Sequence, residues 1–216
     1  MSRFNNFFSS ESFAMRFLTT LCNLMYINLL FLICCIPIIT IGPALTAMYS
    51  TIFKCLRGED PTITKVFFSA LKNNFKQSFK IWLPLLFFIL GLSASIYWTI
   101  NVLDESYKYI LYPSSIALFL LFCIMMYLFP QIAVFEQTTQ IVFKNSCLLA
   151  ISNMPTTIMM VVIPVIIYLI AGLSPKAYVM VISIMLFFGT ALVAYIYSFF
   201  LKNIFNKIIG DKNDNV

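Results

Sequence analysis

An uncharged stretch constrains this chain more than any other feature. Between Arg16 and Lys54 there is no charged side chain, and the apolar run breaks only around Pro37 and Pro43. A membrane-spanning helix needs about 20 consecutive apolar residues. The stretch is long enough for one such helix and a second, shorter helix joined to it by a proline-containing turn. We therefore interpret the chain as a protein folded in a lipid bilayer.

The composition supports this interpretation and narrows the possible chemistry. Hydrophobic residues make up 61% of the chain and charged residues 10%, whereas soluble domains carry about 25% charged residues. The absence of histidine excludes histidine-containing zinc sites and Ser-His-Asp triads. The chain also lacks Walker A, GxSxG and HExxH motifs. We expect no enzyme activity, no catalytic residue, no cofactor and no metal site.

The apolar runs predict an all-α polytopic membrane protein that forms a single membrane domain. We expect five clear transmembrane helices and one short helix over 43–56, which either crosses the bilayer or re-enters it. Two cytoplasmic amphipathic segments complete the fold. The expected parts are an interfacial N-terminus (1–16), a helical hairpin with a Pro37–Pro43 turn (17–56), a basic amphipathic cytoplasmic helix (57–80), two spans (81–135), a cytoplasmic segment (136–156), two further spans (157–201) and a cytoplasmic tail (202–216).

The segment 57–80 has two distinct faces. Apolar residues recur at every fourth position from Ile63 to Phe79, and lysines occupy another face. This pattern is typical of a helix that lies on an anionic leaflet, with its lysines reaching the head groups. A docking surface for a partner is the alternative. The lysines of this candidate lipid or partner docking face are Lys65, Lys72, Lys76 and Lys80.

Residues at the ends and in the middle of the expected spans have different predicted roles. Trp82, Tyr97 and Trp98 lie near the two ends of the span over 81–103, as in an aromatic belt at the membrane interfaces. Uncharged polar residues inside the spans are expected to form hydrogen bonds between helices. These residues are Asn23, Asn28, Thr40, Ser93, Ser95 and Thr190.

The distribution of basic residues predicts the orientation. The segment from Lys54 to Lys80 holds six lysine and arginine residues, whereas each expected outer loop holds one lysine. By the positive-inside rule this segment is cytoplasmic, and so are both termini. The net charge of +6 does not predict nucleic-acid binding, because the basic residues flank apolar spans and meet lipid head groups there.

The break between Pro37 and Pro43 then becomes the outer end of a helical hairpin. Two prolines and a glycine free backbone groups that lipid cannot satisfy, and Thr40 is the nearest side chain able to bond them. We interpret the segment as a structural turn or interface and keep a ligand site as the alternative. The candidate residues are Pro37, Thr40, Gly42, Pro43 and Tyr49.

Several motifs resemble those of one family of small bacterial membrane proteins. The run from Cys34 to Tyr49 carries a P-x-x-T-x-G-x-A pattern, and Lys65 to Trp82 is a helix rich in phenylalanine, lysine and asparagine. Phe129-Pro130 and the segment Lys144 to Ala150 extend the similarity along the chain. Together they resemble the YesL family of integral membrane proteins, which is a domain of unknown function.

The resemblance implies a place beside a transporter. Members of that family are found with carbohydrate ABC importers in the cell membrane of low-GC Gram-positive bacteria. It therefore implies an accessory subunit in contact with the lipid bilayer and with ABC permease transmembrane subunits, which would support permease assembly, stability or activity. A stand-alone channel or facilitator and a membrane-bound regulator are the alternative hypotheses.

Overall fold

The computed structural model describes residues 2–59, 62–102 and 104–213, and within these residues the regular structure is entirely helical. Among the described residues, six segments are long and apolar enough to cross a membrane, as expected for a multi-pass membrane protein. The elements are α1 (Ser2–Cys34), the 3-10 turn η1 (Ile38–Thr40), α2 (Ile41–Leu56), α3 (Ile63–Asn101), the 3-10 turn η2 (Glu105–Ile110), α4 (Leu111–Val134), α5 (Thr139–Ser152), α6 (Met154–Gly172), α7 (Pro175–Ile184), the π-helical segment η3 (Met185–Gly189) and α8 (Thr190–Asn213).

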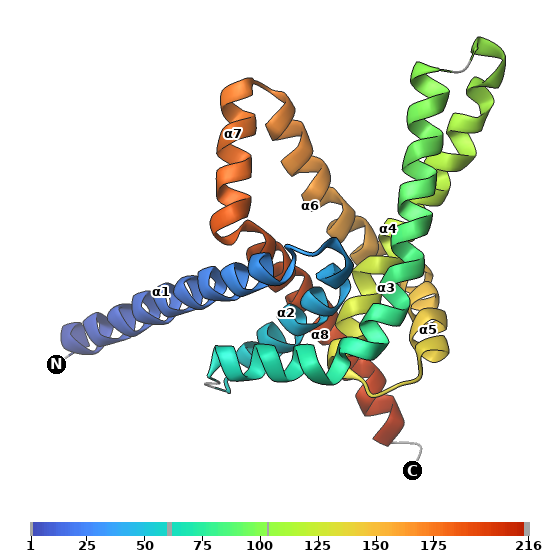
Figure 1. Cartoon of the computed structure of the whole chain (residues 1–216). Coiled ribbons are helices and arrows are strands. Elements are labelled where there is room, and N and C mark those ends of the chain that lie inside the picture. Colours follow the sequence, from blue (N-terminus) through green and yellow to red (C-terminus); the bar gives the residue numbers. More distant parts are fainter. Residues whose placement is uncertain (1, 60–61, 103, 214–216) are drawn as a thin grey trace.

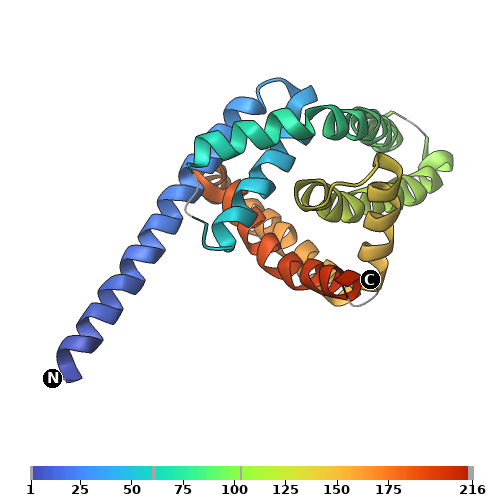
Figure 2. The same ribbon diagram turned by 90° about the horizontal axis from the view of Figure 1, so that it is seen from below.

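Two helical hairpins and one long helix extend from a packed centre (Figure 1). The α3–α4 hairpin and the α6–α7 hairpin extend to the same side of the molecule and diverge from each other. The N-terminal part of α1 projects away from the other helices in both views (Figures 1 and 2). The two hairpins expose much of their apolar surface, which in a membrane lies against lipid or another protein.

Helix α2 is the centre of the packed region, although it is short. Of the span Ile38–Leu56, 56% of the residues are buried inside the protein, compared with 11% for Met154–Gly172. Small residues such as Ala44 and Ala47 are completely buried and let neighbouring helices approach closely. Helices α1, α3, α4 and α8 all contact α2. The expected short helix is therefore a candidate span enclosed by protein.

Helix α1 joins the expected interfacial segment over 1–16 to the expected first span, and the candidate span within it begins at Phe17, as expected. The helix is continuous from Ser2 to Cys34. Among the residues whose burial is described, the buried ones of α1 begin at Leu24 and include Ile27 and Phe31. Asn23, nearer the N-terminus, lines a cavity together with Ile52 of α2. The sequence also predicts an interfacial face formed by Phe4, Phe7 and Phe8, and the side chains of these residues lie outside the described residues. The helix continues through the polar region because no proline interrupts it.

Helix α3 corrects an expected boundary, since it runs continuously from Ile63 to Asn101 across the expected division at 80. The sequence also predicts a helix start with Asp60 as N-cap and Pro61 in the first turn, and these two residues lie outside the described residues. Pro84 lies inside α3, where it removes one backbone donor and its ring crowds the preceding turn. The helix changes direction along its length in Figure 1, as expected for a proline kink.

The C-terminal segment continues the last helix. The sequence predicted a cytoplasmic tail from residue 202, and in the structure α8 includes this segment as far as Asn213. Phe205 is 2% exposed, and its ring lies 5.9 Å from that of Phe53 and 5.3 Å from that of Phe135. The Lys202 ammonium donates a hydrogen bond to the Leu56 carbonyl at 3.2 Å. These contacts tie the last helix to the end of α2.

Candidate functional site

The turn between α1 and α2 is held by local hydrogen bonds. The Thr40 hydroxyl oxygen lies 2.6 Å from the carbonyl oxygen of Cys34 and 2.7 Å from that of Pro37. The Thr40 backbone N–H donates to Pro37 O at 3.0 Å. The Thr40 hydroxyl can thus satisfy the Cys34 carbonyl at the end of α1, which no longer has a helical partner, while the Pro37 carbonyl accepts from the Thr40 backbone N–H. Pro43 lies in the first turn of α2, where a missing N–H breaks no intrahelical bond.

Gly42 and Trp82 make the closest approach between α2 and α3. A Cβ atom added to Gly42 would lie 2.4 Å from the Cβ of Trp82 and 3.1 Å from the Phe129 ring. The indole N–H of Trp82 donates to the Ile38 carbonyl at 2.9 Å. Trp82 is 5% exposed, so the expectation that it belongs to an aromatic belt is wrong. Trp82 links the turn to α3 through this hydrogen bond, and only glycine fits at position 42 against its side chain.

Tyr97 and Trp98 differ from Trp82, because both are exposed near the far end of α3. Their position agrees with the expected aromatic belt. Periodicity alone did not separate the two kinds of aromatic residue. An aromatic residue near a span end looks the same in the sequence whether lipid or protein receives it.

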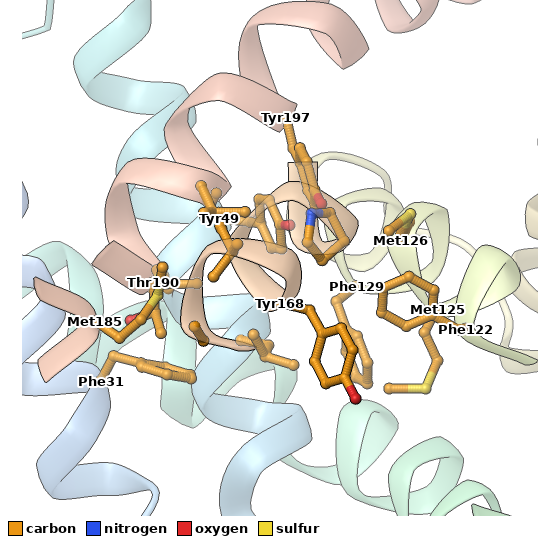
Figure 3. A pocket seen from close by; sticks show the side chains of 17 residues that line it. Phe31, Tyr49, Phe122, Met125, Met126, Phe129, Tyr168, Met185, Thr190 and Tyr197 are labelled. Carbon is orange, nitrogen blue, oxygen red and sulfur yellow. The ribbon is translucent and has the colours of Figure 1, made fainter. Parts of the chain in front are cut away.

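Tyr49 lies two helical turns beyond Gly42 and lines an apolar pocket of about 510 Å³ (Figure 3). The pocket is formed by α1, α2, α4, α6, η3 and α8. Tyr49 and Tyr197 form its buried side, and Tyr168, which is 78% exposed, marks its open side. The Tyr197 hydroxyl donates to the Met160 carbonyl at 2.7 Å. None of the described residues that line the pocket is charged, so it suits hydrocarbon rather than a polar solute.

The sequence did not predict this pocket, because its walls come from segments far apart in the chain. The one available signal is its methionines, Met48, Met125, Met126 and Met185. Methionine adapts its shape to irregular apolar surfaces. Such residues are indistinguishable in the sequence from ordinary core or lipid-facing methionines.

Asn28 of α1 binds the π-helical segment between α7 and α8. Its amide nitrogen donates to Leu186 O at 2.8 Å, and its amide oxygen accepts from Ala191 N at 3.1 Å and from the Thr190 hydroxyl. A π-helical segment leaves backbone groups without their usual partners, and the buried amide satisfies them. The expected interhelical hydrogen bonding of Asn28 and Thr190 is confirmed. The π-helical segment interrupts the span that was expected over 177–201, and the sequence did not predict this interruption.

In the lysine-bearing part of α3, the lysine face is exposed as expected, but the apolar face does not lie against lipid as the lipid-surface interpretation predicted. Lys65, Lys72, Lys76 and Lys80 are exposed, as expected. However, Phe67 on the apolar face is completely buried, and α3 packs against α2. Protein, not lipid, therefore covers the apolar face at this position. The lysine face remains accessible to lipid head groups or to a partner.

Comparisons with known proteins match only part of the chain. Residues 24–96 match a family described as "Protein of unknown function, DUF624". The matched region contains the Pro37–Pro43 turn, α2 and most of α3, so this part of the chain is similar to that family. No curated protein and no solved structure matches the chain.

Proposed function

We propose that this protein is a non-enzymatic accessory membrane subunit that binds the permease subunits of a carbohydrate ABC importer and supports their assembly, stability or activity. One observation supports the part of this proposal that concerns a membrane partner. It is an outward-facing stripe on α3, which is formed by residues 76, 80, 87, 91, 94 and 98. The importer part is supported by the resemblance of the Cys34–Tyr49 and Lys65–Trp82 segments to the YesL family.

The stripe contains a notch formed by small residues. Gly91 and Ala94 are both exposed, and nothing lies within 4 Å of a Cβ atom added to Gly91. The large exposed side chains of Phe87 and Trp98 flank the notch on the same helical face. Small residues bring no advantage against flexible lipid chains, but they allow the backbone of a second helix to approach closely. The notch therefore favours a transmembrane helix as the occupant.

The same helical face continues into the basic half of α3. Residues 76, 80, 87, 91, 94 and 98 follow one another at the spacing of a single helix face. Helix α3 has 39 residues and a length of about 58 Å, which exceeds the roughly 30 Å hydrocarbon core. In the expected orientation, the notch lies within the membrane and the lysines lie on its cytoplasmic side. A partner helix that packs into the notch and has an acidic cytoplasmic end would complement both the notch and the lysines.

Copurification from the native membrane tests the proposal. After crosslinking and extraction in mild detergent, the tagged wild-type protein should bring down ABC permease subunits. Replacing Gly91 with leucine fills the notch and should reduce the recovered permease by at least about tenfold, because displaced helix packing removes several contacts. Gly172→Leu is the matched control, since Gly172 is equally open but lies on α6.

Two results would count against the proposal. A wild-type protein that is recovered without any permease is not a subunit of one. Equal losses for Gly91→Leu and Gly172→Leu would exclude the α3 stripe as the docking surface. Solute flux through liposomes that contain this protein alone would support the channel hypothesis instead.

A further inference from the structure

A polar groove lies between α2 and the first turns of α3, beside the lysine face, with which it shares only Lys65. Its volume is about 360 Å³. Its polar lining residues are Ser50, Lys54, Lys65, Ser69, Asn73 and Asn74. Two lysines and four neutral hydrogen-bonding side chains thus converge on one space, at the end of α2 that the charge distribution places on the cytoplasmic side.

The positive charges of the groove have no counter-charge among the described residues that line it. Neither Lys54 nor Lys65 has a carboxylate partner among the described residues, and no acidic side chain lines the groove. The nearby Glu59 lines a different cavity, which lies towards α1. Lys54 is half-buried, so its ammonium group is partly removed from water. An ammonium group in this setting favours an anion beside it.

The neutral side chains of the groove also have unused hydrogen-bonding capacity. The amide nitrogen of Asn74 donates to the Ala70 carbonyl at 3.1 Å. The side chains of Ser50, Ser69 and Asn73 make no hydrogen bond to another described residue. Hydroxyl and amide donors placed between two ammonium groups suit a ligand that presents several anionic oxygens.

We propose that this groove binds the phosphate group of an anionic phospholipid from the inner leaflet. Lysine is a common phosphate ligand, acting as a point charge. Lys54 lies in the last turn of α2, which belongs to the candidate span Ile38–Leu56. The groove therefore lies where a span ends, at the depth of the lipid phosphates. This location favours a lipid phosphate over a soluble phosphate ester.

The site is independent of the proposed docking stripe. Lys72, Lys76 and Lys80 do not line the groove, although they lie on the same helix and carry the same charge. They provide a matched control, because removing two of them changes the net charge of the protein by the same amount as removing Lys54 and Lys65. A generic attraction to an anionic surface would respond equally to both changes.

The test is lipid retention by the full-length protein, measured by native mass spectrometry after purification from nanodiscs that contain phosphatidylglycerol and phosphatidylcholine. The wild type should retain one phosphatidylglycerol molecule in preference to phosphatidylcholine. Lys54→Gln/Lys65→Gln should weaken this retention by about fivefold per lysine. Lys72→Gln/Lys76→Gln should leave it within about twofold of the wild type.

Three outcomes would overturn the assignment. Equal losses in the two double variants would remove the groove as a specific site. Equal retention of phosphatidylcholine and phosphatidylglycerol would exclude recognition of an anionic lipid. The third outcome is that inorganic phosphate stabilises the detergent-purified wild type but not Lys54→Gln/Lys65→Gln, while the wild type shows no selectivity among lipids. The ligand would then be a soluble anion and not a lipid. If the double variant fails to fold, Ser69→Ala and the exposed Lys65→Gln provide the same comparison singly.

Discussion

Gly42→Ala is the substitution for which the structure sets the sharpest expectation. The new methyl group would lie 2.4 Å from Trp82 Cβ and 2.8 Å from Trp82 Cγ. Because Cβ is fixed to the backbone, a rotation of the indole ring cannot relieve the closest contact. Helices α2 and α3 must separate, and the Trp82 hydrogen bond to Ile38 at 2.9 Å must lengthen or break.

The expected cost has two parts. Overpacking of a filled core costs about 1–3 kcal/mol, and loss of one buried hydrogen bond adds about 1 kcal/mol. Alanine is also a better helix former than glycine, which returns about 0.5–1 kcal/mol. The net decrease in the free energy of unfolding is then about 1–3 kcal/mol. For a chain of this size it corresponds to a fall in Tm of roughly 3–10 °C.

Thermal unfolding in mild detergent, followed by circular dichroism, measures this effect. Gly91→Ala is the matched control, because it makes the same chemical change on a helix whose neighbouring space is open. We expect its Tm to equal or slightly exceed that of the wild type. A Gly42→Ala protein as stable as Gly91→Ala would refute the close approach of α2 and α3. Trp82→Ala should not rescue Gly42→Ala, since alanine retains the Cβ atom that makes the closest contact.

Three further substitutions probe buried polar and aromatic groups. Asn28→Ala should lower the unfolding free energy by about 1–3 kcal/mol, because it leaves the π-helical segment without its hydrogen bonds to Asn28. Hydrogen exchange of the backbone should accelerate over 185–191. The control is Asn23→Ala, which should change neither the unfolding free energy nor the exchange rate, because the Asn23 side chain bonds no other described residue. Gln131→Leu should raise Tm, since both amide atoms are buried without a hydrogen-bond partner among the described residues; an unchanged or lower Tm would contradict this reasoning. Phe205→Ala should lower the unfolding free energy, measured in a detergent unfolding titration, by about 3–5 kcal/mol. Asn206 is exposed, so Asn206→Ala should leave the unfolding free energy unchanged. Equal effects of the two substitutions would show that the end of α8 does not pack on the core.

The sequence predicted the helical spans well because each span carries its own signal. A run of about 20 apolar residues cannot remain in water, whatever the rest of the chain does. Pro37, Thr40 and Pro43 likewise marked the turn from local chemistry alone, because proline removes a backbone donor wherever it occurs. Asn28 and Thr190 were expected to bond between helices, since a polar group among lipid chains needs a partner.

The tertiary structure decided which apolar side chains face protein and which face lipid. Trp82 and Trp98 have the same chemistry, yet one seals the turn against α3 and the other is exposed. Similarly, Phe67 looked like a lipid-facing residue and is buried. Hydrophobicity reports only that a side chain leaves water. Because lipid and protein interiors are both apolar, the choice between them depends on where distant helices pack, and the pocket at Tyr49, the groove at Lys54 and the open notch at Gly91 all result from that packing.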